Sequence, residues 1–282
     1  MRDDHSLKQR GPEESPGIAF IGRVGSLTLS VLQEIGGLVW MLKETGAEII
    51  DRFHQKRAPL RLEDFSFQCN RAGVESIPMI ILLSVFLGLT MALLTGYQLR
   101  IFGIVTLVPA VVSVSFTREM GPLFTGIVLA SRVGAAYTAE LGSMTAGGEV
   151  NAIEGMGIGA LRYLVTPRLL AIFCLTPCLS VIAVISGICG AAFISSLLLQ
   201  ISYGYFYDQV MTNLLVKDML SGIVKSLFFG FIIGSLSCYK GLSMRGGAVG
   251  VGNATTASVV ASICAVIACD SVCNVFLITF FP

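Results

Sequence analysis

Four ionisable side chains interrupt stretches of the chain that are otherwise apolar: Arg118, Glu119, Lys225 and Asp270. A charged group at the centre of a bilayer costs a few kcal/mol unless it is paired or hydrated. Arginine can hold an anionic phosphate with a bidentate fork, and lysine can hold it as a point charge. We therefore expect Arg118, Glu119 and Lys225 to serve a function rather than to occur by chance.

Asp270 has two interpretations. At about 1.5 Å per helical residue, Lys225 lies roughly 12 Å and Asp270 roughly 16 Å from the outer ends of their apolar stretches. The similar depth predicts a Lys225–Asp270 charge pair. Such a pair could serve a ligand, or it could only lock two helices together, and the sequence leaves both open.

Long apolar stretches must position these residues. The chain is 54% hydrophobic and 13% charged, whereas soluble domains carry about 25% charged residues. Residues 169–207 contain no charged side chain, and about 20 apolar residues suffice for a helix to cross a bilayer. We predict an all-α integral membrane protein with about five transmembrane helices, an N-terminal interfacial amphipathic helix and a short cytoplasmic helix. The spans are expected at about 77–99, 104–137, 165–199, 217–239 and 254–281.

The N-terminal part differs from the rest. Residues 1–17 are polar and predict a flexible tail, and residues 18–75 predict an amphipathic helix in the interface followed by a basic connector. Trp40 would lie near the headgroups, although residues 18–50 could also form a first span. Residues 76–282 form the transmembrane domain. Ten of the 19 basic residues lie before residue 76, so the positive-inside rule places the N-terminus in the cytoplasm and the C-terminus outside.

Residues 140–159 are the longest polar segment between the predicted spans. Met144, Val150, Ile153 and Met156 recur at spacings of three and six, which suits a short helix with one apolar face. The segment could be a solvated loop or a helix that docks into a groove on a cytoplasmic partner. The adjacent Gly147 and Gly148 cost about 2 kcal/mol of helix propensity, so this helix is expected to be short or mobile.

Several kinds of chemistry find no support in the sequence. No Gly-x-x-x-x-Gly-Lys-Ser/Thr phosphate loop occurs, so ATP used by that route must be bound by another polypeptide. The two histidines lie near the N-terminus and most cysteines lie in apolar runs, so we expect no metal site and no catalytic residue. A formal net charge of +1 argues against nucleic-acid binding.

Several sequence strings resemble the MlaE/YrbE family, the permease subunits of ABC lipid transporters that work with MCE-domain proteins. They are residues 118–123 (REMGPL), 130–144 (ASRVGAAYTAELGSM), 151–158 (NAIEGMGI), 162–168 (RYLVTPR), 225–230 (KSLFFG) and 246–256 (GGAVGVGNATT), followed by Asp270. The resemblance covers about residues 20–280 in the same order.

The resemblance implies residue roles. The resemblance implies a lipid path near Arg118, Glu119 and Lys225. The rest of that path should be apolar to hold acyl chains, and Tyr97, Leu99 and Ala92 are candidates for it; the alternative is that they form ordinary packing or lipid-facing surface. The segment 140–159 is expected to be the coupling helix that contacts the ATPase. The coupling candidates are Glu140, Met144, Glu149, Ile153, Glu154 and Met156.

The resemblance also implies a function. The chain is expected to be a non-catalytic, homodimeric permease subunit in a bacterial inner membrane, with ATP bound by a separate ATPase subunit. It would move phospholipid between that membrane and a periplasmic MCE protein, and so maintain outer-membrane lipid. An alternative is a secondary transporter of a lipid or amphiphile, driven by an ion gradient, with Glu119, Lys225 and Asp270 as a relay. Two further rivals are a membrane-embedded lipid enzyme and a scaffold that only anchors an MCE protein.

Overall fold

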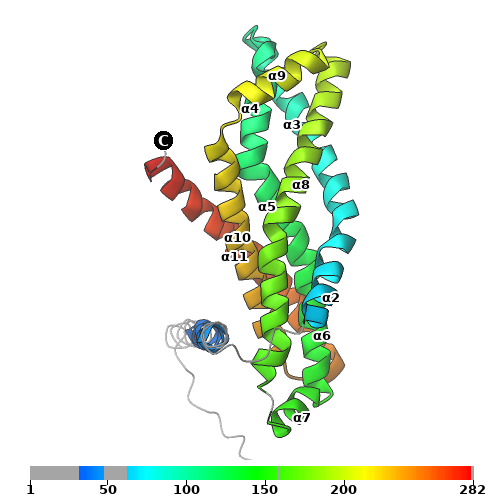
Figure 1. Cartoon of the computed structure of the whole chain (residues 1–282), viewed down its shortest axis with the longest axis vertical. Coiled ribbons are helices and arrows are strands. Elements are labelled where there is room, and N and C mark those ends of the chain that lie inside the picture. Colours follow the sequence, from blue (N-terminus) through cyan, green and yellow to red (C-terminus); the bar gives the residue numbers. More distant parts are fainter. Residues whose placement is uncertain (1–31, 48–61, 158, 281–282) are drawn as a thin grey trace, which may run out of the picture.

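A computed structural model describes residues 32–47, 62–157 and 159–280 of the chain (Figure 1). The regular structure of this part is helical throughout, and it contains no strand. The prediction of an all-α membrane protein is confirmed at this level. The predicted tail at 1–17, and residues 18–31 and 48–61, lie outside the described residues.

Four helices are long and apolar enough to cross a membrane: Phe65–Ile101, Leu161–Leu198, Val216–Leu242 and Gly247–Leu277. They correspond to the predicted spans at 77–99, 165–199, 217–239 and 254–281. Their elements are α2 (Leu62–Ala72), η1 (Val74–Ser76) and α3 (Ile77–Ile101), then η5 (Leu161–Val165) and α8 (Thr166–Leu198), and finally α10 (Val216–Leu242) and α11 (Gly247–Phe280).

The remaining predicted span, 104–137, is a series of shorter helical segments. They are η2 (Val105–Leu107), α4 (Val108–Ser115), η3 (Phe116–Met120), α5 (Gly121–Leu129), η4 (Ala130–Gly134) and α6 (Ala135–Ala146). Arg118, Glu119 and Arg132 make this series less apolar than the four helices above. That it crosses the membrane as a fifth span therefore stays a prediction.

Two of these segments, η3 and η4, are π-helical, and so is η5. A π turn closes its hydrogen bond over five residues instead of four, so each one shifts the register of the helix around it. Arg118 lies in η3, Arg132 in η4 and Arg162 in η5. The irregular turns thus coincide with arginines in otherwise apolar surroundings.

The N-terminal region is helical over residues 32–47. This helix exposes Leu32, Ile35 and Val39 and buries Met41 and Thr45. Its position in the membrane interface stays a prediction. The basic connector that the sequence places before residue 76 is helical from residue 62 onward, because α2 and η1 run directly into α3.

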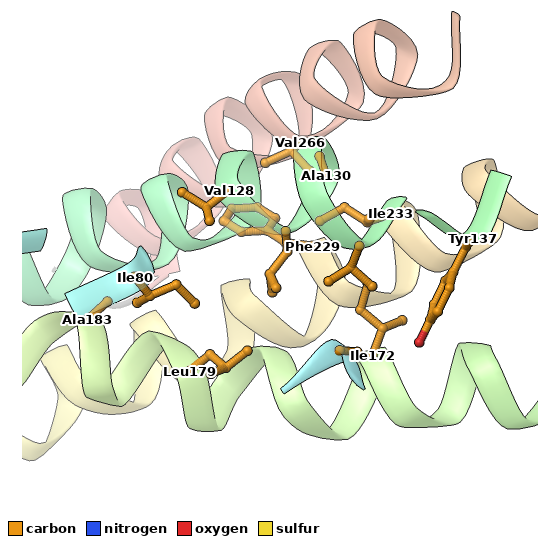
Figure 2. Packing of buried hydrophobic residues seen from close by; sticks show 13 residues of the cluster. Ile80, Val128, Ala130, Tyr137, Ile172, Leu179, Ala183, Phe229, Ile233 and Val266 are labelled. Atoms are coloured by element: carbon orange, nitrogen blue, oxygen red, sulfur yellow. The ribbon is translucent and has the colours of Figure 1, made fainter. Parts of the chain in front are cut away.

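The core lies where α3, α5, α8, α10 and α11 meet (Figure 2). Phe229 and Ile233 of α10 lie among Val128, Ile172, Leu179 and Val266, and all six are almost fully buried. Packing between α3 and α8 is closest at Gly88, where a Cβ atom would lie 1.9 Å from the Gly187 carbonyl oxygen. Small residues of this kind let membrane helices approach closely.

The two ends of the bundle carry different short helices (Figure 1). At one end lies α7 (Glu149–Gly155), which follows Gly148 in the left-handed conformation (φ 75°). At the other end lies α9 (Tyr203–Asn213), which is capped by Ser202 and was not predicted. Residues 203–207 belong to the charge-free run 169–207, which gives no sign that a separate short helix begins there.

Candidate functional site

Lys225 lies at the centre of a polar cluster inside the helical bundle, with a side chain only 1% exposed. Its ammonium donates hydrogen bonds to Glu119 Oε1 at 2.8 Å, to the Arg118 carbonyl oxygen at 3.1 Å and to Asn274 Oδ1. Asp270 Oδ1 lies 3.2 Å from Lys225 Nζ. The three N–H groups of the ammonium are therefore matched by three acceptors, and a second carboxylate adds an ion pair.

Asn274 closes this cluster. Its amide nitrogen donates to Glu119 Oε2 at 3.0 Å and to Asp270 Oδ2 at 3.2 Å, while its oxygen accepts from Lys225. Asn274 and Asp270 are four residues apart on α11, so they share one face of that helix. The amide holds the two carboxylates apart and bonds to both, and it thereby connects η3, α10 and α11.

The local sequence explains why the Arg118 carbonyl is available to Lys225. Pro122 has no N–H to donate to the carbonyl four residues before it, which is that of Arg118. At Gly222 the approach of α10 is so close that a Cβ atom would lie 2.6 Å from the Thr117 carbonyl oxygen. Pro122 leaves the Arg118 carbonyl without that donor, and Gly222 lets α10 come close enough for Lys225 to donate a hydrogen bond to this carbonyl.

Arg118 and Asp218 extend the cluster toward the end of α10. Arg118 Nε lies 3.6 Å from Asp218 Oδ1, and the Asp218 side chain is 4% exposed. Asp218 Oδ2 also accepts a hydrogen bond from the Leu215 N–H at 3.1 Å, which caps the start of α10. The Arg118 side chain is 34% exposed, so it is held by Asp218 yet reaches open space. We call Arg118, Glu119, Asp218, Lys225, Asp270 and Asn274 the Lys225 cluster.

A cleft of about 570 Å³ opens beside the Lys225 cluster, between α10 and the last part of α11. In Figure 1 this part of α11 diverges from the bundle. The charged side chains that line the cleft among the described residues, Arg118, Lys217 and Lys225, are all basic. The rest of its wall is mainly apolar: Leu220, Val224, Phe228, Val272, Phe276 and Leu277, with Ser221 and Cys273. The cleft thus joins a basic region to a hydrocarbon-like surface.

The structure brings together Arg118, Glu119, Lys225 and Asp270, which the sequence singled out separately. The apolar candidates for the lipid path lie elsewhere, on α3. Ala92 is fully buried and, with the half-buried Leu99, belongs to a second core cluster, and Tyr97 is 71% exposed. None of these three lines the cleft. Their role in lipid binding stays a prediction.

The expected coupling segment is not one helix. Residues 140–146 belong to α6, and α7 begins only after the turn at Gly147 and Gly148. Met144, Val150 and Ile153 pack against a core cluster that includes Leu141 and Leu164. Three of the four residues of the expected apolar face therefore turn toward the bundle. Glu149 and Glu154 are exposed on α7, and Met156, which directly follows this helix, is 67% exposed.

Glu140, another coupling candidate, is partly exposed and is held by two arginines. Its Oε2 lies 3.1 Å from Arg71 Nη1 and its Oε1 lies 3.0 Å from Arg168 Nη2. Arg168 is 5% exposed and also donates to the Leu164 carbonyl oxygen at 2.6 Å. Glu140 thus joins α2, α6 and α8, a structural role that the sequence did not indicate.

Two members of the Lys225 cluster were missed by sequence reasoning. Asn274 is uncharged, and so a search for intramembrane charges passes over it, although its spacing of four from Asp270 was a usable signal. Asp218 follows Lys217 just before an apolar stretch. Charged residues at such a boundary usually mark only the limit of a transmembrane span, so Asp218 was not considered as a site residue. Within the described residues, no group of His, Cys, Asp and Glu could hold a metal ion.

Comparison with known proteins decides the family. The family model described as Permease MlaE matches residues 65–276. The chain belongs to the MlaE permease family. The matched range contains the whole Lys225 cluster, α7 and α9.

Individual MlaE-family relatives are similar over most of the chain. A probable ABC transporter permease protein of Rickettsia felis is 33% identical over 239 residues, which cover 85% of this chain and 90% of the relative. One of Synechocystis sp. is 34% identical over 199 residues, covering 71% of this chain and 76% of the relative. The chloroplastic protein TRIGALACTOSYLDIACYLGLYCEROL 1 of Arabidopsis thaliana is 32% identical over 209 residues, covering 74% and 60%. The chain is a multi-pass membrane protein of a family of ABC transporter permeases.

Proposed function

We propose that this permease binds a phospholipid in the cleft between α10 and α11. It would pass the lipid between a bacterial inner membrane and a periplasmic MCE protein, as one of two copies in a transporter driven by a separate ATPase subunit. The observation that carries the proposal is the composition of the cleft, where basic side chains meet an apolar wall. A phospholipid has the two complementary parts, an anionic phosphate for the basic side chains and acyl chains for the apolar wall.

The two central cations of the site, Lys225 and Arg118, differ in exposure, and we assign them different roles on that basis. Lys225 is almost fully buried and its N–H groups already have acceptors, so it organises the carboxylates behind the cleft. Arg118 is one-third exposed at the cleft wall, and a guanidinium is suited to a phosphate. We therefore assign the headgroup contact to Arg118 and the positioning of Glu119 and Asp270 to Lys225.

Relatives support a lipid as the cargo. The Arabidopsis relative bears the name of a glycolipid, trigalactosyldiacylglycerol. This chain contains no phosphate loop, and ABC permeases work with ATPase subunits, so ATP would be bound and hydrolysed by a partner. Nucleotide state can move a lipid only if the permease conformations that it favours bind the lipid differently. An opening and closing of the α10–α11 cleft would provide that difference.

Lipid binding can be tested on the purified full chain. We expect phospholipid to co-purify in detergent, with the bound amount measured as phosphorus per chain. The variant Arg118→Gln should lower this amount about three- to tenfold, because one charge-assisted contact to phosphate is lost. Arg100→Gln is the matched control, since Arg100 is an exposed arginine near the end of α3 and does not line the cleft. Equal phospholipid in the parent, Arg118→Gln and Arg100→Gln would refute this binding site.

A further inference from the structure

A second cavity, outside the Lys225 cluster, lies at the α7 end of the bundle. Its volume is about 380 Å³, and both polar and apolar side chains line it. Helix 32–47 contributes Trp40 and Glu44, α7 contributes Val150, Asn151 and Glu154, and the remaining wall comes from Thr145, Gly159, Ala160, Leu161 and Leu242. We call this cavity the Trp40 groove.

Contacts with α10 hold one wall of the Trp40 groove in place. Lys240 Nζ lies 2.6 Å from Glu34 Oε1. At Gly37 a Cβ atom would lie 2.5 Å from the Tyr239 hydroxyl oxygen, so the helix rests directly on that tyrosine. Met41 and Thr45 are 4% and 1% exposed on the same side. Helix 32–47 is therefore docked, and Trp40 and Glu44 are presented by a packed element.

The chemistry of the groove favours a cationic group. Trp40 is 63% exposed, and an indole face attracts ammonium and guanidinium groups. Glu44 and Glu154 add a carboxylate from each of the two helices, and both are exposed. The charged residues that line the groove among those described are these two glutamates. An aromatic ring with flanking carboxylates is complementary to an arginine or lysine side chain.

We propose that the Trp40 groove receives a basic side chain of the ATPase subunit, so that helix 32–47 and α7 together form the docking surface. This inference rests on the proposed function, because it assumes an ATPase bound at the α7 end. It specifies that the ATPase contributes a basic side chain, and it adds helix 32–47 to the coupling region. One inserted side chain would touch both α7 and the N-terminal helix, so movement of the ATPase would be transmitted to α10 through Tyr239 and Lys240.

Site-specific cross-linking tests the occupant directly. The photoreactive amino acid p-benzoyl-phenylalanine replaces Trp40 in the full chain, which is expressed together with the ATPase subunit of its own transporter. We expect a cross-link to an ATPase peptide that contains Arg or Lys, identified by mass spectrometry. Val39 is the matched control position, because it is 56% exposed on the same helix but does not line the groove. A cross-link from position 40 to phospholipid alone, or an equal yield from position 39, would overturn the proposal.

Charge removal gives a second, quantitative readout. We expect Glu44→Gln and Glu154→Gln each to weaken retention of the ATPase on the tagged chain about three- to tenfold, with a smaller effect of added salt than in the parent. Asp208→Asn is the control, since Asp208 is an exposed carboxylate on α9 at the opposite end. Unchanged retention in both glutamate variants would refute the groove while leaving the ATPase partnership intact. If the parent chain retains no ATPase at all, the proposed function itself fails.

Discussion

The Lys225 cluster and the α7 end both contain several charged residues, but the central charge is buried and paired in the first region, whereas charges are exposed in the second. In the Lys225 cluster the ammonium is buried and surrounded by oxygen atoms from two elements, η3 and α11. On α7 the carboxylates of Glu149 and Glu154 are exposed. Charges inside the bilayer must be matched within the protein, whereas charges at a water-facing end remain available to a partner. The contrast predicts that substitutions in the first region affect folding and those in the second affect assembly.

The largest effect is expected for Lys225→Met. The substitution leaves the Glu119 and Asp270 carboxylates without the cation that both contact, and breaking a buried ion pair costs about 3–5 kcal/mol. We expect a clear loss of thermal stability and of monodisperse protein in detergent. Adding Asp270→Asn should recover part of the loss, since it removes one unmatched charge.

Lys43→Met is the control for Lys225→Met, because Lys43 is an exposed lysine on helix 32–47. A Lys225→Met protein as stable as the parent would mean that the cluster contributes nothing to folding. The distinction between the two regions would then have to be abandoned.

The second effect is expected for Gly222→Ala. A methyl group here would lie 2.6 Å from the Thr117 carbonyl oxygen, a backbone atom, so α10 must move away from η3. Overpacking of this kind costs about 1–3 kcal/mol. Thermal unfolding of the purified chain measures it.

Gly36→Ala is the matched control for Gly222→Ala, because a Cβ atom there meets nothing within 4 Å. Alanine is also the better helix former, so this control should leave stability unchanged or raise it slightly. Equal behaviour of the two alanine variants would contradict the close approach of α10 to η3.

A smaller effect on stability is expected for Glu140→Gln, about 1–2 kcal/mol, because the nearly buried Arg168 loses its carboxylate partner while Glu140 itself is partly exposed. This variant also decides between two roles for Glu140. If Glu140 is structural, ATPase retention per folded chain should stay unchanged. If it is a coupling residue, retention should fall at constant stability.

Glu75→Gln is the control for Glu140→Gln. It also breaks an arginine–carboxylate pair, since Glu75 Oε2 lies 3.1 Å from Arg132 Nη2, but the Glu75 side chain is 55% exposed. Such a pair contributes less than about 1 kcal/mol. A Glu75→Gln loss as large as that of Glu140→Gln would show that burial does not separate the two pairs.

The smallest effect on stability is expected for Met156→Ser, within about 0.5 kcal/mol, because Met156 is 67% exposed at the end of α7. If α7 docks on an ATPase subunit, the same variant should reduce retention of that subunit. Retention equal to the parent, with Glu154→Gln also unchanged, would remove α7 from the docking surface.

The transmembrane helices could be predicted because their signal is composition over many residues. Residues 161–198 and 216–242 are so much more apolar than soluble sequences that the predicted spans, 165–199 and 217–239, differ from the observed helices only at their ends. The π-helical segments could not be predicted in this way, because a single extra residue in a turn leaves an apolar stretch apolar. The short helix α9 was missed because its one charge, Asp208, was taken as the end of the preceding apolar run.

The site was predictable where charge alone identifies a residue. Depth along two helices suggested that Lys225 and Asp270 meet, and the atoms lie 3.2 Å apart. Apolar composition does not say which side of a helix turns inward. For that reason it does not show that Ala92 on α3 packs in the core, or that Phe228 and Phe276 line the cleft. Only the relative rotation of α10 and α11 identifies these two.

The π turn at Ala130–Gly134 has a consequence for how this chain tolerates insertions and deletions. Because this turn contains one residue more than an α turn, removing a single residue there could restore a regular helix without shortening the bundle noticeably. Because the π turn takes up its extra residue within one turn, the side chains on the two flanks would keep nearly the same orientation after such a deletion, whereas a deletion in a regular α-helix turns one flank by about 100° relative to the other. A one-residue deletion within the regular part of α5 or α6 would therefore misalign the interior, whereas one within this π turn would keep the flanking side chains in place, although both leave the hydropathy profile almost unchanged.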